Sequence, residues 1–299
     1  MVDPLAEVVT LLQPSPGVAK VVSAAGTWRV RRSEAGRPFY CVVIAGICRL
    51  QLEGRAPISL RADDFVLIPE SHDFEMSSLE PPPSRDAEVA PVVLPSGEIR
   101  HGTADGPPEV VLLVGHCAFG SPDAALLVSL LPSLVHVRGE RRLCMLVDLV
   151  GEESRARRAG RDMILSRLLE VLLMEAFRTM TAVSASPGLL RGLADGRLAI
   201  AVRLMHEDPR RPWTVPELAK AAALSRSVFF DRFRRAVGLS PMEYLLAWRM
   251  ALAKDMLRRK QGSVAEIAER VGYGSASTFS VAFTRHVGQP PTHFVRGMA

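Results

Sequence analysis

The stretch Thr214-Val-Pro-Glu-Leu-Ala219 recurs 49 residues later as Ser263-Val-Ala-Glu-Ile-Ala268. In both copies a hydroxyl residue stands three positions before a glutamate, which is the spacing of a capping box at the start of a helix. An internal repeat of this kind indicates two copies of one structural unit. The last third of the chain is therefore predicted to consist of two similar helical units.

The repeat continues beyond the two capping boxes, now at an offset of 50 residues. The matched residues are a serine, two phenylalanines four apart, a Val-Gly pair and a proline: Ser225, Phe229, Phe233, Val237, Gly238 and Pro241 in the first copy, and Ser275, Phe279, Phe283, Val287, Gly288 and Pro291 in the second. Each copy thus predicts a short helix, a turn and a second helix, which is helix-turn-helix spacing. The paired phenylalanines share one helical face, so we expect them to pack in the core.

The opposite face of each second helix is predicted to meet DNA. Its residues are Arg226, Ser227, Phe230, Asp231, Arg234 and Arg235 in the first unit, and Ser275, Ala276, Ser277, Ser280, Val281 and Arg285 in the second. Arg226 suits guanine, and Asp231 suits the amino group of cytosine. Phe230 and Val281 suit thymine methyl groups. The other three arginines are expected to bind phosphates, which position the protein without reading sequence.

The segment Pro241–Arg258 between the two units is predicted to be one continuous helix. Proline is compatible with its first turn, and Gly262 follows its basic end. Its 18 residues rise about 1.5 Å each and span roughly 27 Å, whereas one turn of DNA is about 34 Å long. A helix of this length is expected to hold two recognition helices near successive major grooves on one face of the DNA.

Charge is divided unevenly along the chain. Residues 195–299 contain 17 Lys or Arg and 9 Asp or Glu, whereas residues 1–194 contain 20 and 23. A basic excess confined to the last third is typical of a surface that faces phosphates. Double-stranded DNA is therefore the predicted partner.

The first part of the chain has the pattern of short strands separated by turns, from about residue 18 to residue 114. Residues 39–44 and 48–52 are two examples, and the pattern is typical of an antiparallel barrel or sandwich. Residues 5–12 are predicted to form a short helix. Residues 80–108, rich in proline, serine and acidic residues, are predicted to form a long loop.

A helical pattern begins after Ser121. Residues 162–179 carry leucines and an isoleucine at helical spacing, a stripe that suits either a core or a dimer interface. Residues 138–161 form a charged stretch, and small residues around Pro187 predict a linker. The predicted fold class is α+β, with three parts in order: a β-barrel domain with a helical dimerisation segment at 1–180, a linker at 181–194 and an all-α DNA-binding domain at 195–299.

The last third resembles the DNA-binding domain of the AraC/XylS family of bacterial transcription regulators, over about residues 195–296. The resemblance rests above all on Ile267-Ala-Glu-Arg-Val-Gly-Tyr273, and also on Leu218-Ala219, Trp248-Arg249 and Pro290-Pro291. It implies a sequence-specific regulator of promoters, an activator that works with RNA polymerase, whose first unit makes most promoter-specific contacts. The second recognition helix is poor in base-reading side chains, so we expect it to supply register and affinity.

The N-terminal half resembles the cupin-like sensor domain found in one branch of that family. The resemblance rests on Asp3-Pro4-Leu5, Trp28, Phe39–Gly46, Leu60–Pro69 and His72. It implies a one-component protein that responds to a small-molecule effector and forms a homodimer.

Two residues are candidates for effector binding: Cys41, at the place of a histidine in that branch, and His72, which follows a predicted strand. Three interpretations remain open: they are ordinary core and loop residues, walls of an effector pocket, or ligands of a soft metal such as zinc. His116-Cys117 is a further candidate pair. The alternative function is a cupin-type metalloenzyme fused to a DNA-binding module, which needs three ligands where the sequence offers two. We therefore expect no catalytic activity, no metal and no cofactor.

The four cysteines form no CxxC pair, which leaves a zinc ribbon unsupported. No signal-peptide pattern begins the chain, and no apolar run is long enough to cross a membrane. The predicted setting is the cytoplasm, without membrane association.

Overall fold

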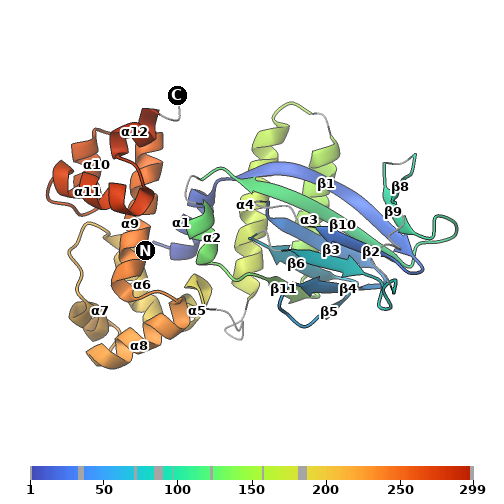
Figure 1. Ribbon diagram of the computed structural model, residues 1–299, viewed down its shortest axis with the longest axis horizontal. Coiled ribbons are helices and arrows are strands. Elements are labelled where there is room, and N and C mark those ends of the chain that lie inside the picture. The colour runs from blue at the N-terminus through green and yellow to red at the C-terminus, as the bar shows by residue number, and fades with distance from the viewer. Residues whose placement is uncertain are drawn as a thin grey trace. The chain divides into compact units, whose positions relative to one another are not determined.

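The computed structural model describes residues 2–32, 37–70, 73–83, 90–95, 97–121, 124–156, 158–180 and 187–296. Through its contacts the chain divides into two compact units, whose elements are labelled in Figure 1. The first, here named the β unit, comprises Gln13–Gly120 and Ser133–Met180. The second, here named the helical unit, comprises Met1–Leu12, Ser121–Pro132 and Thr181–Ala299. The helical unit is thus assembled from three separate segments of the chain.

The β unit contains two sheets. In the larger sheet the strands are ordered β11 (Val135–Arg138), β6 (Asp64–Ile68), β3 (Phe39–Ala45), β10 (Val110–Phe119), β1 (Pro14–Ala25), β9 (Ile99–Gly102) and β8 (Val92–Val93). In the smaller sheet they are ordered β2 (Arg29–Arg32), β7 (Phe74–Ser77), β4 (Ile47–Leu52) and β5 (Ile58–Arg61). Strand β1 is antiparallel to β10 and parallel to β9. The predicted β-rich first domain is confirmed.

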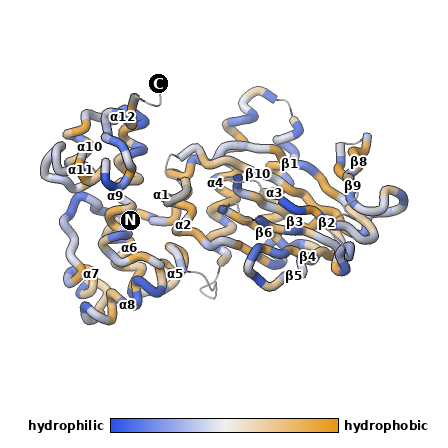
Figure 2. Tube along the Cα trace, viewed as in Figure 1, coloured by the Kyte–Doolittle hydropathy of each residue, from blue (hydrophilic) through white to orange (hydrophobic). Residues whose placement is uncertain are grey.

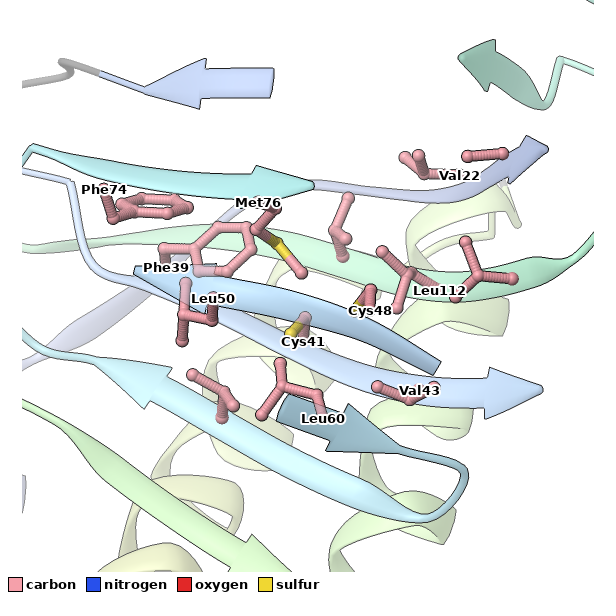
Figure 3. Close-up of a cluster of buried hydrophobic side chains, with 14 of the residues drawn as sticks. Val22, Phe39, Cys41, Val43, Cys48, Leu50, Leu60, Phe74, Met76 and Leu112 are labelled. Atoms are coloured by element: carbon pink, nitrogen blue, oxygen red, sulfur yellow. The ribbon is translucent and has the colours of Figure 1, made fainter. Parts of the chain in front are cut away.

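The inner faces of the two sheets share one hydrophobic core. Exposure alternates along β4, so that Cys48, Leu50 and Leu52 are buried while their neighbours are not. They belong to one cluster with Cys41 and Val43 of β3, and Figure 3 shows side chains from both sheets pointing toward one another. This alternation is the period of two that the sequence of 48–52 predicts.

Two helices, α3 (Arg141–Arg155) and α4 (Arg161–Thr179), pack against each other and against β1. Helix α4 confirms the helix predicted at 162–179. The charged stretch predicted at 138–161 is largely the helix α3, which buries Leu143, Val147 and Val150. Three apolar residues at spacings of four and three make a narrow stripe, and the charged residues between them obscure it in the sequence.

The prediction of a long loop at 80–108 is wrong for two short segments, which form the strands β8 and β9. Strand β8 pairs with β9, and β9 lies parallel to β1 with Val22 opposite Ile99. The buried Arg100 guanidinium stabilises this arrangement by donating to Ser23 Oγ and to the carbonyl oxygens of Thr103 and Gly106. A strand that pairs with such a distant partner leaves no local pattern that would distinguish it from a loop.

The helical unit contains helices from both ends of the chain. In chain order they are α1 (Pro4–Leu12), α2 (Ala124–Ser129), α5 (Leu189–Ala194), α6 (Leu198–Glu207), α7 (Val215–Ala221), α8 (Arg226–Val237), α9 (Pro241–Arg258), α10 (Val264–Arg270), α11 (Ala276–Val287) and α12 (Pro291–Arg296). Hydrophobic and hydrophilic residues alternate along them, as Figure 2 shows. The helices predicted at 5–12 and 241–258 are confirmed, and α5 lies inside the predicted linker 181–194.

Helix α1 buries Val8, Val9 and Leu12 and packs beside α2, α6 and α9. The sequence assigns α1 and α2 to the first predicted domain, whereas α1 contacts α6 and α9 of the last third, and α2 contacts α1. The predicted domain boundaries at 180 and 195 stay a prediction. Within the described residues, no helix combines the length and the apolar character that crossing a membrane requires.

Candidate nucleic-acid interface

The first helix-turn-helix unit consists of α7 and α8. Thr214 begins α7 through a capping box: its N–H donates to Glu217 Oε2 at 2.9 Å, and Glu217 N–H donates back to Thr214 Oγ1. Ser225 begins α8 by accepting from Val228 N–H. Both caps confirm the starts predicted from the repeat. They determine which side chains lie on the first turn of α8.

The two phenylalanines of α8, Phe229 and Phe233, are fully buried. Their ring centroids lie 5.6 Å apart, and Phe233 meets Tyr244 of α9 edge-on at 5.8 Å. The prediction that they are core residues is confirmed. Because this face of α8 is buried, the opposite face is turned to solvent.

The solvent face of α8 carries the predicted DNA-binding residues of the first unit. Phe230 is half-buried, and the others are exposed: Arg226, Ser227, Asp231, Arg234 and Arg235. Arg232, on another face of the helix, pairs through Nε with Asp195 Oδ2 at 2.5 Å. All the predicted residues of α8 except the half-buried Phe230 are therefore exposed, and Val228 and Arg232 are exposed beside them. Their contacts with DNA stay a prediction.

The second unit, α10 and α11, repeats the arrangement of the first. Ser263 N–H donates to Glu266 Oε2 at 2.7 Å, which completes the second capping box. Ser275 begins α11 by accepting from Thr278 N–H at 3.2 Å. The phenylalanines of α11 are fully buried, with ring centroids 5.4 Å apart. The prediction of two units on one plan is confirmed.

The hydroxyl groups predicted to meet DNA on α11 bond within that helix. Ser280 Oγ donates to Ala276 O at 2.7 Å. Ser275 Oγ lies 3.0 Å from Ser277 Oγ and 2.8 Å from Thr278 Oγ1. These local bonds reduce the number of donors that α11 presents to a base edge.

A groove of about 870 Å³ lies beside α11. Val281 lines it and is 71% exposed. The remaining lining residues are Leu246, Ser277, Thr278, Ala282, Arg285 and His286. Of these, Leu246, Thr278, Ala282 and His286 are absent from the sequence-based prediction. Thr278 and Ala282 lie three residues before Val281 and Arg285, and these spacings are the signal that points to them. His286 lies four residues after Ala282 and follows only once that residue is included.

Helix α9 joins the two units. Ser240 begins it through a third capping box, in which its N–H donates to Glu243 Oε2 at 2.9 Å. Pro241 occupies the first turn, and Tyr244 and Trp248 are buried. The helix ends at Arg258, so its bounds are those predicted from the sequence.

The three capping glutamates carry pKa values below their ordinary range. Hydrogen bonds from the Thr214 hydroxyl and backbone lower the pKa of Glu217. Hydrogen bonds from the backbone and hydroxyl of Ser240 lower the pKa of Glu243, and those of Ser263 lower the pKa of Glu266. Each ionised carboxylate lies at a helix N-terminus, where negative charge is favourable.

The β unit contains a small cavity of about 30 Å³. Its walls are mainly apolar and include Trp28, Phe39, Phe74, Met76 and Leu112, together with the polar residues Arg32, His101 and His116. Burial lowers the pKa of His101, and the neighbouring charges of Arg32 and Lys20 lower it further. The imidazole is therefore held neutral.

Cys41 is fully buried between the sheets and is not among the described residues that line the cavity. Burial raises the pKa of Cys41 well above its ordinary value and raises that of Cys48 to about 12. Both residues are thus thiols at neutral pH. His72 lies outside the described residues. Within the described ranges, no three His, Cys, Asp or Glu side chains gather in a way that could hold a metal ion.

Comparison with known proteins covers nearly the whole chain. A cupin family model matches residues 3–182, and a helix-turn-helix domain model matches residues 218–297. A putative AraC-like transcription regulator of Streptomyces lividans is 35% identical over 303 residues, covering 97% of this chain and 96% of the relative. One of Streptomyces antibioticus is 34% identical over 297 residues and covers 97% of each chain.

Among solved structures, the DNA-binding domain of the transcriptional factor AdpA, in complex with a target DNA, is similar to part of the chain. It is 30% identical, with a TM-score of 0.32, and the match covers 33% of this chain and 89% of that one. The full-length relatives and the two family matches agree with the two capped helix-turn-helix units. The chain belongs to the AraC family of transcription regulators, with a cupin domain followed by a helix-turn-helix domain that binds DNA.

Proposed function

We propose that this chain is a one-component activator of bacterial promoters in which α8 reads most of the base sequence. One observation carries the proposal. Helix α8 presents Arg226 and Asp231 on its exposed face, and these side chains suit guanine and cytosine in the major groove. Helix α11 presents Val281 and hydroxyl groups that bond within the helix. The second unit therefore contributes register and affinity, with Arg285 on a phosphate.

Selection of binding sites from genomic DNA tests this proposal. Arg226→Ala and Asp231→Ala are each expected to change the preferred base at one position, because a good base contact discriminates by about 1–3 kcal/mol. The matched control is Arg203→Ala, because Arg203 is an exposed arginine of α6 and lies outside both helix-turn-helix units. Unchanged preferences in both variants would contradict the role of α8. If the full chain selects no sequence, the proposed function itself is wrong.

The effector site that we propose is the cavity of the β unit. A cavity of about 30 Å³ has room for about one water molecule, so an effector must displace side chains such as Met76. The mainly apolar walls favour a small apolar effector. Cys41 belongs to the same core cluster as Phe39 and Met76, which supports a place for it near that site.

A change in melting temperature on adding metabolite extracts tests the effector site. Leu112→Phe, which fills the cavity, is expected to remove any rise that the wild-type chain shows. A rise that persists in this variant would place the effector elsewhere.

The proposed homodimer is supported by apolar side chains on α3 and α4. Met145 and Leu149 of α3, and Ile164 and Val171 of α4, are roughly half exposed. Exposed apolar residues on two helices that pack together are typical of an interaction face. Light scattering on Leu149→Glu combined with Val171→Glu is expected to give the mass of a monomer. A dimer that survives both changes would contradict this interface.

RNA polymerase is the proposed partner of the DNA-bound chain, and the cytoplasm is the proposed setting. The relatives are named as transcription regulators, and this supports a β unit without a catalytic role. Transcription in vitro from a selected site, with and without the chain, is the test. Stimulation is expected, and repression at every selected site would overturn the assignment as an activator.

A further inference from the structure

Three parts of the helical unit meet beside α9. The segment 208–213 leads from α6 into the first helix-turn-helix unit, Arg249 lies within α9, and Gly272 lies in the turn between α10 and α11. We call these residues the junction. It connects parts of both units that are far apart along the chain.

Arg249 attaches α9 to the segment that leads into the first unit. Its Nε donates to Pro209 O at 2.7 Å, and its Nη2 donates to Arg211 O at 2.8 Å. Hydrogen bonds from a charged donor are roughly twice as strong as those between neutral groups. One side chain thus holds two carbonyl groups of the same segment.

Gly272 brings the turn of the second unit against that same segment. Its φ of +84° lies in the left-handed region that favours glycine. A Cβ atom at this position would lie 2.7 Å from Arg210 O and 2.9 Å from Pro209 O. It would also lie 2.8 Å from Arg249 Nη2. The second unit therefore touches the approach to the first unit more closely than any side chain would allow.

The segment 208–213 is itself held by internal hydrogen bonds. Trp213 is buried, its Nε1 donates to Asp208 O at 2.9 Å, and its backbone N–H donates to Arg211 O at 2.7 Å. A segment held in this way is rigid, so it couples the position of Gly272 to the position of the first helix-turn-helix unit.

A surface ion pair also crosses the junction, from Arg210 Nη2 to Glu269 Oε1 at 3.4 Å. Its side chains are 60% and 74% exposed, and exposed pairs of this kind contribute little. The firm attachment therefore rests on Arg249 and Gly272.

The connecting helix fixes the distance between the two units, and each unit packs on it through apolar side chains, Phe233 on Tyr244 and Phe279 with Met250. Apolar packing is not directional, so it leaves small rotations of one unit against the other. A second attachment removes that freedom. We propose that Arg249 and Gly272 are positioning residues that hold α8 and α11 in one rotational relation and so select the spacing between two half-sites on DNA. This rests on the proposed function of α8 and α11 as the two DNA-reading helices.

The geometry of DNA makes this relation measurable. One base pair added between the half-sites rotates one half-site against the other by roughly 35° and moves it by about 3.4 Å, because one turn holds about 10 base pairs in about 34 Å. Two rigidly held recognition helices lose contacts on such a site. Two loosely held helices follow the change.

The experiment uses the full chain and fluorescence anisotropy on duplexes with both selected half-sites. In three duplexes, the two half-sites are separated by the natural spacing, by one base pair more and by one base pair less. Wild type is expected to bind the altered spacings roughly tenfold more weakly. The measured ratio is the affinity for the natural spacing divided by the affinity for an altered spacing. Arg249→Met, which keeps the apolar stem and loses both donors, is expected to reduce this ratio to roughly twofold. Gly272→Ala is expected to do the same. Arg249→Lys, with one ammonium for two carbonyl groups, should lie between.

Arg210→Met is the matched control, because it makes the same change in the same segment but removes only the exposed pair. It is expected to keep the wild-type ratio. A duplex with the first half-site alone reports folding of the first unit, and we expect Arg249→Met and Arg249→Lys to bind it as wild type does. Circular dichroism checks the whole chain, so if Gly272→Ala unfolds, the two Arg249 variants decide.

Two results would overturn the proposal: Arg249→Met with an unchanged tenfold ratio, or Arg210→Met with the same loss as Arg249→Met. A wild-type chain that binds its half-sites equally well at every spacing would also contradict the role proposed for the junction, but it would leave the proposed function intact. A wild-type chain that selects no DNA would contradict the proposed function instead.

Discussion

His206 Nδ1 of α6 lies 2.6 Å from Glu7 Oε2 of α1, with the His206 side chain fully buried. On its other side, His206 Nε2 lies 2.7 Å from Tyr244 Oη of α9. Trp248 stacks on the imidazole with ring centroids 4.0 Å apart. With Nδ1 as donor to the carboxylate and Nε2 as acceptor from the tyrosine, a neutral imidazole satisfies both partners. This set of contacts connects α1, α6 and α9.

Removal of the Glu7 carboxylate is expected to destabilise the helical unit. Glu7→Ala leaves the buried His206 Nδ1–H without this acceptor, and such a loss costs about 1–3 kcal/mol. Glu7→Gln keeps an acceptor and should cost less. Denaturant unfolding measures the change, and Glu207→Ala, an exposed glutamate of α6, is the matched control. Equal effects of Glu7→Ala and Glu207→Ala would show that the carboxylate does not support α1.

His206 should also make stability depend on pH. Burial lowers its pKa below the ordinary 6.5, and the hydrogen bond to Glu7 offsets this only in part. The unfolded chain therefore takes up a proton at higher pH than the folded chain does. The free energy of unfolding should fall as the pH drops below about 6.5, by at most about 1.4 kcal/mol per pH unit.

Unfolding curves between pH 5 and 8 test this dependence against His206→Gln. His101 of the β unit, whose pKa is also lowered, remains in both chains, so the difference between the curves isolates His206. Parallel curves would rule out the contribution of His206.

The capping glutamates predict a second loss of stability at lower pH. The pKa values of Glu217, Glu243 and Glu266 lie below the ordinary 4.5 because their carboxylates accept hydrogen bonds. Their contribution is complete above about pH 4.5 and is lost as the pH falls through the lowered values. Glu266→Gln keeps the capping geometry without a titrating group, so its acid unfolding should be shallower. Glu207→Gln serves as control and should follow wild type.

Salt dependence separates a phosphate contact from a base contact. Arg285→Ala is expected to weaken binding to all sequences alike and to reduce the salt slope by about one, because one phosphate contact releases about one counterion. Affinities measured from low to high salt give the slope, with Arg203→Ala as control. A change of base preference in Arg285→Ala would instead make it a reader of sequence.

Features that depend on local chemistry could be predicted from the sequence. The bounds of α9 follow from a proline in the first turn and a basic end before Gly262. The starts of α8 and α11 follow from Ser225 and Ser275, and their buried faces from phenylalanines four apart. Such signals act within one turn of a helix, so they can be recognised without knowledge of the rest of the chain.

Features that depend on distant partners could not be predicted. The cavity brings together Trp28 and His101, which no spacing connects. Arg249 has the pattern of a surface charge on a helix, and its acceptors lie 38 and 40 residues earlier in the chain. The apolar stripe of α1 is visible in the sequence, but a stripe does not identify the surface that it covers.

Because the helical unit is assembled from three segments of the chain, recombination between relatives of this chain can separate parts of that unit. A crossover in the region 181–186 would separate α1 from α6 and α9, on which it packs. The hybrid would then combine His206 and Tyr244 from one parent with the residue at the position of Glu7 from the other. A functional chimera with a foreign cupin domain should therefore keep Pro4–Leu12 and Ser121–Pro132 from the parent that supplies the last third.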